Sequence, residues 1–175
     1  MTNNMVRTTG LRTVKDDQTW RYGEQLSGTV SVTLDMDVFQ AITKADRDKY
    51  FTGYTDDATD FYIKSGLPLA RITSGASAGL YGPYNPSATD GRKEAVAGLL
   101  ESNIHVLVTA GGWVVDDTQM VGMRFRGNVI VENLPGAAVT DAVWNGDFVA
   151  VDPDTGVTKR LPNEKNTAAT PSTGN

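Results

Sequence analysis

The chain has 175 residues, enough for one domain with a core, but its apolar content of 39% is low for a fully packed globule of this length. Its net charge of −5 argues against binding to nucleic acid or to an anionic membrane surface, since both attract basic proteins. The absence of cysteine excludes disulfides, thiolate metal sites and cysteine nucleophiles. No apolar run approaches the roughly 20 residues of a membrane-spanning helix, and the N-terminus lacks a signal-peptide core, so we expect a protein used without secretion.

The first segment of the chain, residues 1–28, is polar and keeps neither a strand period nor a helix period. This pattern predicts an extended N-terminal arm, and plain terminal disorder fits the same residues about equally well. Trp20 argues against complete disorder, because a large aromatic side chain tends to be buried, either on its own domain or on a partner.

The next segments predict short strands and one short helix. Residues 29–34 alternate between apolar and hydroxyl side chains and form the clearest strand of the chain. Asp37 is the expected N-cap of a helix that should end where polar residues take over at 46–49. Residues 50–60 form a turn-rich connection, and residues 61–63 are predicted to form a short strand.

The middle of the chain predicts further strands. Residues 95–100 favour a strand over a helix, because a central glycine weakens a helix. Residues 104–108 alternate and should form a buried strand. Residues 121–131 predict another strand, with Met123 and Phe125 pointing inward.

The C-terminal part predicts a hairpin followed by a tail. Residues 152–156 have the composition of a tight turn between strands at 148–151 and 156–158. They also imitate the start of a calcium loop, but the third acid and the distal glutamate of that pattern are missing. Residues 161–175 are rich in Asn, Thr, Ala, Pro and Ser, which predicts a disordered tail.

The most informative stretch is residues 66–101, which reads as an apolar strand, a polar loop, an Asp90-Gly91 turn and a second apolar strand. The order of the apolar strand, a Ser/Gly loop, Gly82-Pro-Tyr-Asn-Pro86, Asp90-Gly-Arg92 and Ala95-Val-Ala-Gly-Leu-Leu100 resembles the phage head decoration protein family, of the lambda head protein D type. With its flanking strands, the resemblance covers roughly residues 30 to 135. It is a pattern of turns and strands and carries no catalytic fingerprint.

The resemblance implies a mainly β fold with short helices, of the β-barrel or β-tulip kind found in decoration proteins, with an extended N-terminal arm and a flexible C-terminal tail. On this basis we expect a capsid-binding arm at residues 1–28, a β-rich decoration domain at 29–160 and a disordered tail at 161–175. The resemblance also implies a homotrimer that binds the major capsid protein on the outer capsid surface. There it would stabilise the expanded, DNA-filled head of a virion assembled in the host cytoplasm.

Two sets of contact residues follow from the resemblance. The apolar side chains of the arm are expected to contact the capsid, namely Val6, Leu11, Val14 and Trp20. The 81–86 loop is expected to form the trimer face or the capsid face, through Tyr81, Pro83, Tyr84 and Pro86. The chain is longer than the lambda type, and the arm, residues 38–60 and residues 144–158 look like additions.

The sequence predicts no catalytic residue, no cofactor and no metal site, and we do not expect an enzyme. His105, the only histidine, lies in an apolar strand and is expected to be structural. The acidic cluster at 56–60 is expected to be a solvated loop. The glycine-rich segment 75–79 is not followed by the Gly-Lys-Ser/Thr of a phosphate loop.

An alternative function is a carbohydrate- or surface-binding β module of a phage particle. That module would need exposed aromatic side chains on one stacking face, and the candidates are Trp113, Trp144, Tyr81 and Tyr84. Packing of the same side chains in a core or at an interface is the competing interpretation.

Overall fold

The computed structural model describes residues 16–23, 28–115 and 118–163. Within these residues, twelve strands dominate over two short α-helices and one 3-10 helix, which confirms the expected mainly β class. The expectations for residues 1–15 and for most of the tail, residues 164–175, lie outside the described residues.

Five strands form a closed barrel in the order β1-β5-β4-β6-β9. They are β1 (Thr29–Asp35), β4 (Pro68–Arg71), β5 (Tyr81–Pro83), β6 (Gly98–Leu100) and β9 (Thr118–Arg124). The longest pairing is antiparallel and joins β1 to β9, from Thr29 opposite Arg124 to Asp35 opposite Thr118. The strand predicted at 29–34 is therefore confirmed as β1. Its last apolar residues face the core, whereas Val30 is exposed at the start of the strand.

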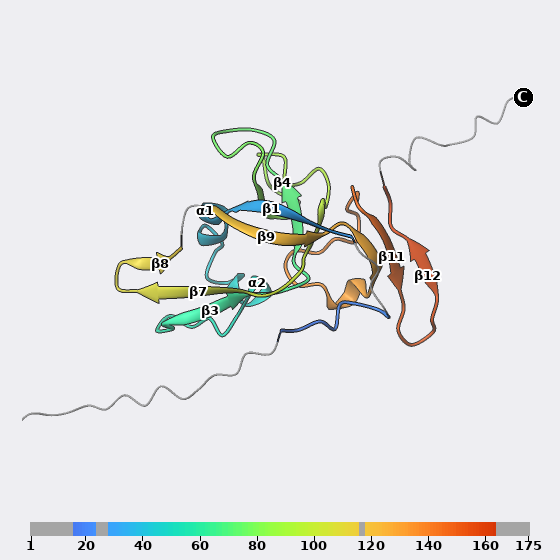
Figure 1. Cartoon of the computed structure of the whole chain (residues 1–175), viewed down its shortest axis with the longest axis horizontal. Helices are drawn as coiled ribbons and strands as arrows, with labels where there is room; N and C mark the ends of the chain where they lie inside the picture. The colour runs from blue at the N-terminus through green and yellow to red at the C-terminus, as the bar shows by residue number, and fades with distance from the viewer. Residues whose placement is uncertain (1–15, 24–27, 116–117, 164–175) are drawn as a thin grey trace, which may run out of the picture.

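A four-stranded sheet in the order β2-β3-β7-β8 extends from one end of the barrel (Figure 1). Its strands are β2 (Phe51–Thr52), β3 (Asp60–Ile63), β7 (Ile104–Thr109) and β8 (Gly112–Val114). The strands predicted at 61–63 and 104–108 are confirmed, but the expected burial of 104–108 is wrong: Val106 alone in that strand is buried. The sheet packs on the core through one face, so alternate side chains point outward.

A three-stranded sheet in the order β10-β11-β12 lies at the opposite end of the barrel (Figure 1). Its strands are β10 (Arg126–Val129), β11 (Asp147–Val151) and β12 (Thr158–Arg160). The predicted hairpin turn is confirmed, because β11 and β12 pair antiparallel and the Gly156 N–H donates to the Asp152 carbonyl at 2.9 Å. Residues 118–129 form two strands instead of one, since the chain leaves the barrel at Phe125 and β10 then pairs with β11.

The helices differ in detail from the expectation. Helix α1 (Met36–Gln40) is capped by Asp35 and not by Asp37, because the Asp35 carboxylate accepts a 2.9 Å hydrogen bond from the Asp37 N–H. Asp35 ends β1 with an extended backbone, the conformation of an N-cap residue. A second helix, α2 (Arg47–Tyr50), forms where the first was expected to end. The 3-10 helix η1 (Val131–Asn133) follows β10.

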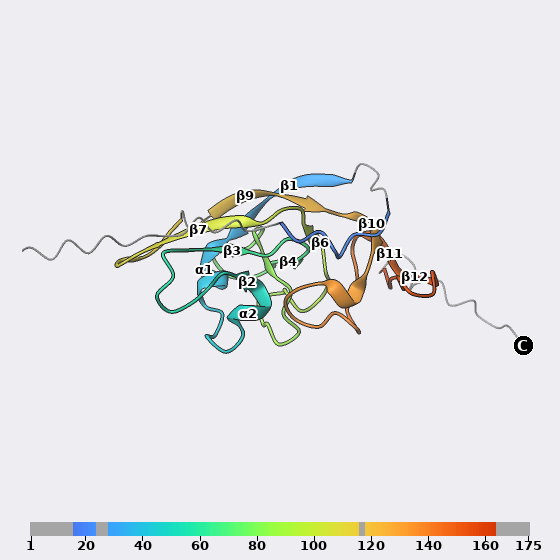
Figure 2. The ribbon, with the colours of Figure 1, turned by 90° about the horizontal axis from the view of Figure 1, so that it is seen from below.

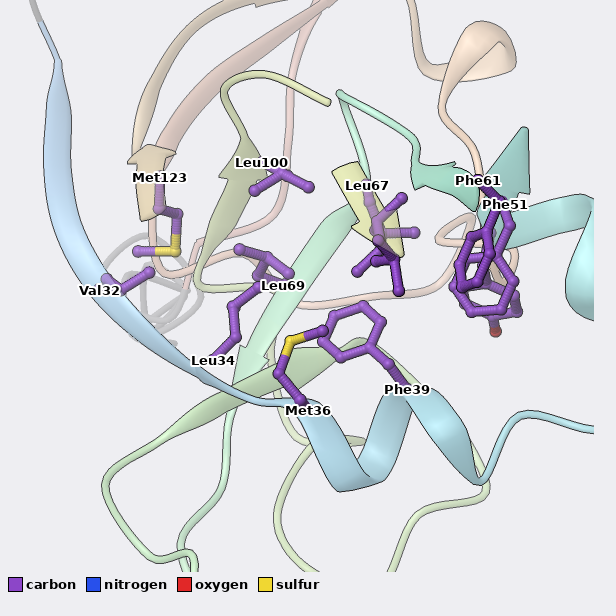
Figure 3. Packing of buried hydrophobic residues seen from close by; sticks show 13 residues of the cluster. Val32, Leu34, Met36, Phe39, Phe51, Phe61, Leu67, Leu69, Leu100 and Met123 are labelled. Atoms are coloured by element: carbon purple, nitrogen blue, oxygen red, sulfur yellow. The ribbon is translucent and has the colours of Figure 1, made fainter. Parts of the chain in front are cut away.

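Two hydrophobic clusters form the core. The first lies between the barrel, α1 and the β2-β3-β7-β8 sheet, and Figure 3 shows Phe39 and Met36 of α1 pointing toward Leu67 and Leu69. The second gathers Trp20, Trp144, Phe148 and their neighbours beside the β10-β11-β12 sheet. Figure 2 shows β1 and β9 along one side of the molecule and α2 toward the opposite side.

Candidate functional site

Residues 16–23, expected as part of the arm, pack against the folded domain. The Trp20 side chain is 1% exposed, and its Nε1 donates to Ser65 Oγ at 3.3 Å. Gly66 has a φ of +74°, and a Cβ there would lie 2.5 Å from the Trp20 ring, so a glycine is needed beside it. The expected capsid contact through Trp20 is therefore corrected, because this side chain belongs to the core of its own domain.

A buried ion pair holds the same segment. The Arg124 side chain is almost fully buried and donates twice to the Glu101 carboxylate, from Nε at 2.9 Å and from Nη2 at 2.7 Å. Arg21 Nη2 lies 3.0 Å from the same carboxylate and donates to the Glu101 carbonyl at 2.8 Å. The Arg21 guanidinium also lies 4.7 Å from the centre of the Trp20 ring.

We call Trp20, Arg21, Ser65, Glu101 and Arg124 the N-terminal clamp. A buried arginine is tolerated where carboxylates and hydrogen bonds satisfy it, and Glu101 supplies both for Arg124. No local pattern in the sequence indicated the clamp, since Arg21 and Glu101 are separated by 80 positions. The only indication of the clamp in the sequence was Trp20, which was expected to be buried either on its own domain or on a partner.

The residues expected in the 81–86 loop do not form one exposed face. Residues 81–83 are the barrel strand β5, and Pro83 and Tyr84 are buried. Tyr81 is half-buried against the first cluster, and Pro86 alone of the four is exposed. Burial, with a smaller contribution from the Asp141 carboxylate, raises the pKa of the Tyr84 phenol. The expectation of a contact face made by all four residues is therefore wrong, because Pro83 at the end of β5 and Tyr84 directly after it are buried in the domain.

The aromatic residues of the alternative function do not form a stacking face. Trp144 and Tyr84 are buried in the second cluster. Trp113 is half-buried, and its ring makes edge contacts with Phe51 and Phe61 at centroid distances of 5.5 and 4.8 Å. Packing in the core thus accounts for these side chains.

His105 lies on the outward face of β7. Its Nε2 is 3.2 Å from Asp60 Oδ2, and its ring stacks on Tyr62 at 4.7 Å. In the part of the chain that the structure describes, no group of three or more His, Cys, Asp or Glu side chains could hold a metal ion. Across the same described residues, no helix is both long enough and apolar enough to span a membrane.

The most exposed apolar side chains near the first cluster lie on β7, β8 and β9. Leu107, Val114 and Met120 are 49%, 53% and 71% exposed, and Leu107 stands directly opposite Val114. Beside them lies a hollow of about 420 Å³, lined by Leu100–His105 and Gln119–Gly122. We call this hollow the β7–β9 groove.

Comparison of the chain with protein-family models, with curated proteins and with solved structures found no match. Among the described residues, the features that could take part in binding include the N-terminal clamp, the β7–β9 groove and the exposed side chains of Leu107, Val114 and Met120.

Proposed function

We propose that the chain is a head decoration protein, a structural virion component that binds as a homotrimer to the outside of a phage capsid. Its partner is the major capsid protein, and its effect is to stabilise the expanded, DNA-filled head. The finer fold that belongs to this proposal is a decoration-protein barrel. The proposed role requires no cofactor, no metal and no chemical turnover.

The observation that carries the proposal is the position of the stretch that resembles the family. Residues 66–101 contribute β4, β5 and β6, three of the five barrel strands. Leu69 of β4 stands opposite Pro83 on one side and Gly98 on the other. The Asp90-Gly91 turn closes on Thr73, whose N–H donates to the Asp90 carbonyl at 2.8 Å. The residues that resemble the decoration protein family thus form much of the barrel, which supports the proposal that the resemblance reflects a related fold.

The N-terminal clamp supports a binding role for the residues before it. Fifteen residues precede Asp16, and an extended segment of that length reaches about 50 Å. In the proposal, Val6, Leu11 and Val14 contact the capsid. The clamp ties that contact to the core of the domain, because Trp20 is buried and Arg21 is paired with Glu101.

Binding by a trimer explains how modest contacts could suffice. Three equivalent arms engage three equivalent sites, so each later contact forms at high effective concentration. Ligands that bind only the assembled, expanded shell stabilise that shell by linkage. The packed DNA pushes the shell outward, and bridges between neighbouring capsomers oppose its rupture.

The test uses expanded heads of the phage that encodes the chain, prepared without it. We expect the purified protein to have the native mass of a trimer, to co-sediment with these heads and to raise the temperature at which they release DNA. A protein that neither sediments with the heads nor changes the release temperature would contradict the proposal.

A matched pair of truncations tests the role of residues 1–15. Deletion of residues 1–15 should abolish sedimentation with heads, whereas deletion of residues 164–175 should leave it intact. The N-terminal deletion must stop before Asp16, because removal of Trp20 would open the second cluster. Circular dichroism and thermal unfolding of both variants show that the domain is still folded. Retained binding by the N-terminal deletion would remove the proposed role of residues 1–15.

A further inference from the structure

We propose that, in the free protein, residues 1–15 bind back onto their own domain as an extended segment in the β7–β9 groove. This contact is independent of the capsid proposal. If both hold, residues 1–15 have two alternative binding sites, and they must leave the groove before they reach a capsid.

The first support is the place where the described chain begins. Asp17 lines a second hollow of about 210 Å³, together with Ser65 and Asn103. Asn103 also lines the β7–β9 groove, and its Oδ1 accepts a 2.7 Å hydrogen bond from the Ser65 N–H. The two hollows therefore share a wall, and the chain enters the described part beside the groove. Because 15 extended residues reach about 50 Å, and even the whole of β7, of which only Ile104 and His105 line the groove, is about 20 Å long, residues 1–15 are long enough to follow the groove.

The second support is the direction of the backbone groups of β7. The Val108 N–H donates to the Thr59 carbonyl at 2.8 Å, so Thr59 and Val108 form a hydrogen-bonded pair. Such pairs alternate along an antiparallel ladder, so the backbone N–H and C=O of His105 and Leu107 point away from β3. Leu107 meets Val114 of β8 on that side, but β8 ends there. The N–H and C=O of His105 thus face the groove with no described strand opposite.

On the other side of the groove, β9 also has backbone groups that point away from its paired strand. The Phe125 N–H donates to the Gly28 carbonyl at 2.8 Å, which makes Gly28 and Phe125 a hydrogen-bonded pair in the β1–β9 ladder. By alternation, the backbone groups of Met120 and Gly122 point away from β1. The Gly122 carbonyl accepts from the Glu101 N–H at 3.0 Å, and Met120, two residues earlier, faces the groove. An extended segment between the two strands could therefore hydrogen-bond to both, as in β-strand addition.

The third support is the match of side chains. Met120 lines the groove and is exposed, and Leu107 and Val114 are exposed on the neighbouring β7–β8 hairpin. Such apolar surface is stabilised when an apolar segment covers it. Residues 1–15 carry apolar side chains at four places with polar residues between them, namely Met1, the adjacent pair Met5 and Val6, Leu11, and Val14.

The fourth support is charge. Residues 1–15 contain Arg7, Arg12 and Lys15 and no acid, so the net charge of −5 leaves −8 on residues 16–175 once this +3 is subtracted. Around the groove, Glu101 is already paired with two arginines, and Asp60 of the β3 face is paired with His105. Both carboxylates keep part of their surface in solvent. The attraction therefore comes from the acidic domain as a whole, and we expect it to weaken with salt.

The test is paramagnetic relaxation enhancement on the full-length chain. Because the chain has no cysteine, Leu11→Cys accepts a single nitroxide label. We expect the amide signals of His105 and Met120 to lose about half their intensity or more relative to the reduced label. The matched control is Thr155→Cys on the exposed β11–β12 turn, whose label should leave both signals unchanged.

Two further measurements make the result decisive. In the Leu11→Cys chain, Met120→Lys should restore both signals, and folding should survive because Met120 is exposed. A mixture of labelled copies without isotope and isotope-enriched copies without label should show no broadening. The proposal is overturned if the Leu11→Cys label broadens neither amide, if Met120→Lys leaves the broadening intact, or if broadening arises only between different copies.

Discussion

The two hairpins at opposite ends of the barrel, β7–β8 and β11–β12, are built differently (Figure 1). Both send aromatic or aliphatic side chains into the core, Trp113 and Val106 on one, Phe148 and Val151 on the other. Their solvent faces differ. The β7–β8 hairpin exposes the apolar side chain of Leu107. Every residue of β12 is also exposed, but its residues, Thr158-Lys-Arg160, are polar or charged.

The difference concerns what each sheet edge can bind. A charged edge strand such as β12 discourages pairing with another chain, because Lys159 and Arg160 would have to be desolvated. The β8 edge has no such protection, and the apolar side chains beside it gain free energy when another surface covers them. This is the end of the molecule where we expect binding to occur.

The largest effect on the free energy of unfolding should come from the aromatic side chains that the two hairpins bury in the core. Phe148 is fully buried, and its ring lies 5.1 Å from the Trp144 ring. Phe148→Ala should lower the free energy of unfolding by about 3–5 kcal/mol. Trp113→Ala should cost less, because Trp113 is half-buried. Urea denaturation of the two variants checks the order, and the reverse order would mean that the β7–β8 end carries the tighter core.

The next effect distinguishes a buried ion pair from an exposed one. Glu101→Ala leaves the buried Arg124 without its carboxylate and should cost about 2–3 kcal/mol. Asp147→Ala removes the partner of Arg160, and both side chains of that pair are about 60% exposed. This matched control should cost no more than about 0.5 kcal/mol. Equal losses in denaturation experiments would contradict the assignment of a clamp.

A smaller, pH-dependent effect should come from the β11–β12 turn. Hydrogen bonds from the Thr155 side chain and from the Asp154 and Thr155 N–H groups hold the pKa of Asp152 below its ordinary value of 3.8. A carboxyl whose pKa is lower in the folded state contributes stability above its unfolded pKa and loses it as the pH falls through the folded value. Asp152→Ala should therefore destabilise the protein at neutral pH, and the difference from the parent should shrink below about pH 4. Thermal unfolding at neutral and acid pH checks this, and a gap that is independent of pH would count against it.

The last substitutions should have the smallest effect on stability and the clearest effect on self-association. Leu107→Lys combined with Val114→Lys should change the free energy of unfolding by less than about 0.5 kcal/mol and reduce nonspecific self-association. Lys159→Val combined with Arg160→Val should do the opposite, because it removes the charges that protect β12. Light scattering over a concentration series measures both. If both double substitutions changed self-association in the same direction, the proposed difference between the two sheet edges would be wrong.

Local chemistry in the sequence was enough to predict several elements. The strand at 29–34 followed from strict alternation, and the 152–156 turn followed from residues that bond to their own backbone. Both depend on neighbours within a few positions. The N-cap prediction missed by two residues for a related reason, because Asp35 and Asp37 are both good caps and the end of β1 decides between them.

The orientation of side chains was harder to predict. Met123 was expected to point inward from an alternating strand, and it is buried, but the neighbouring Arg124 is buried as well. Met123 faces the first cluster, while Arg124 pairs with Glu101 of the N-terminal clamp. Pro83 and Tyr84 were expected at a contact surface, but Pro83, the last residue of β5, and Tyr84, which follows it, are both buried. In each case a segment distant in sequence supplies the cover, so no local pattern could reveal it.

Alternation, turn residues and composition are local properties, so they were sufficient to predict a mainly β protein with short strands, tight turns and an acidic charge. The burial of residues around Trp20, the burial of residues 82–84 and the exposure of Leu107 and Val114 among the described residues became evident only from the folded structure. Burial depends on which distant surfaces meet, and Arg21 meets Glu101 across 80 positions of the chain.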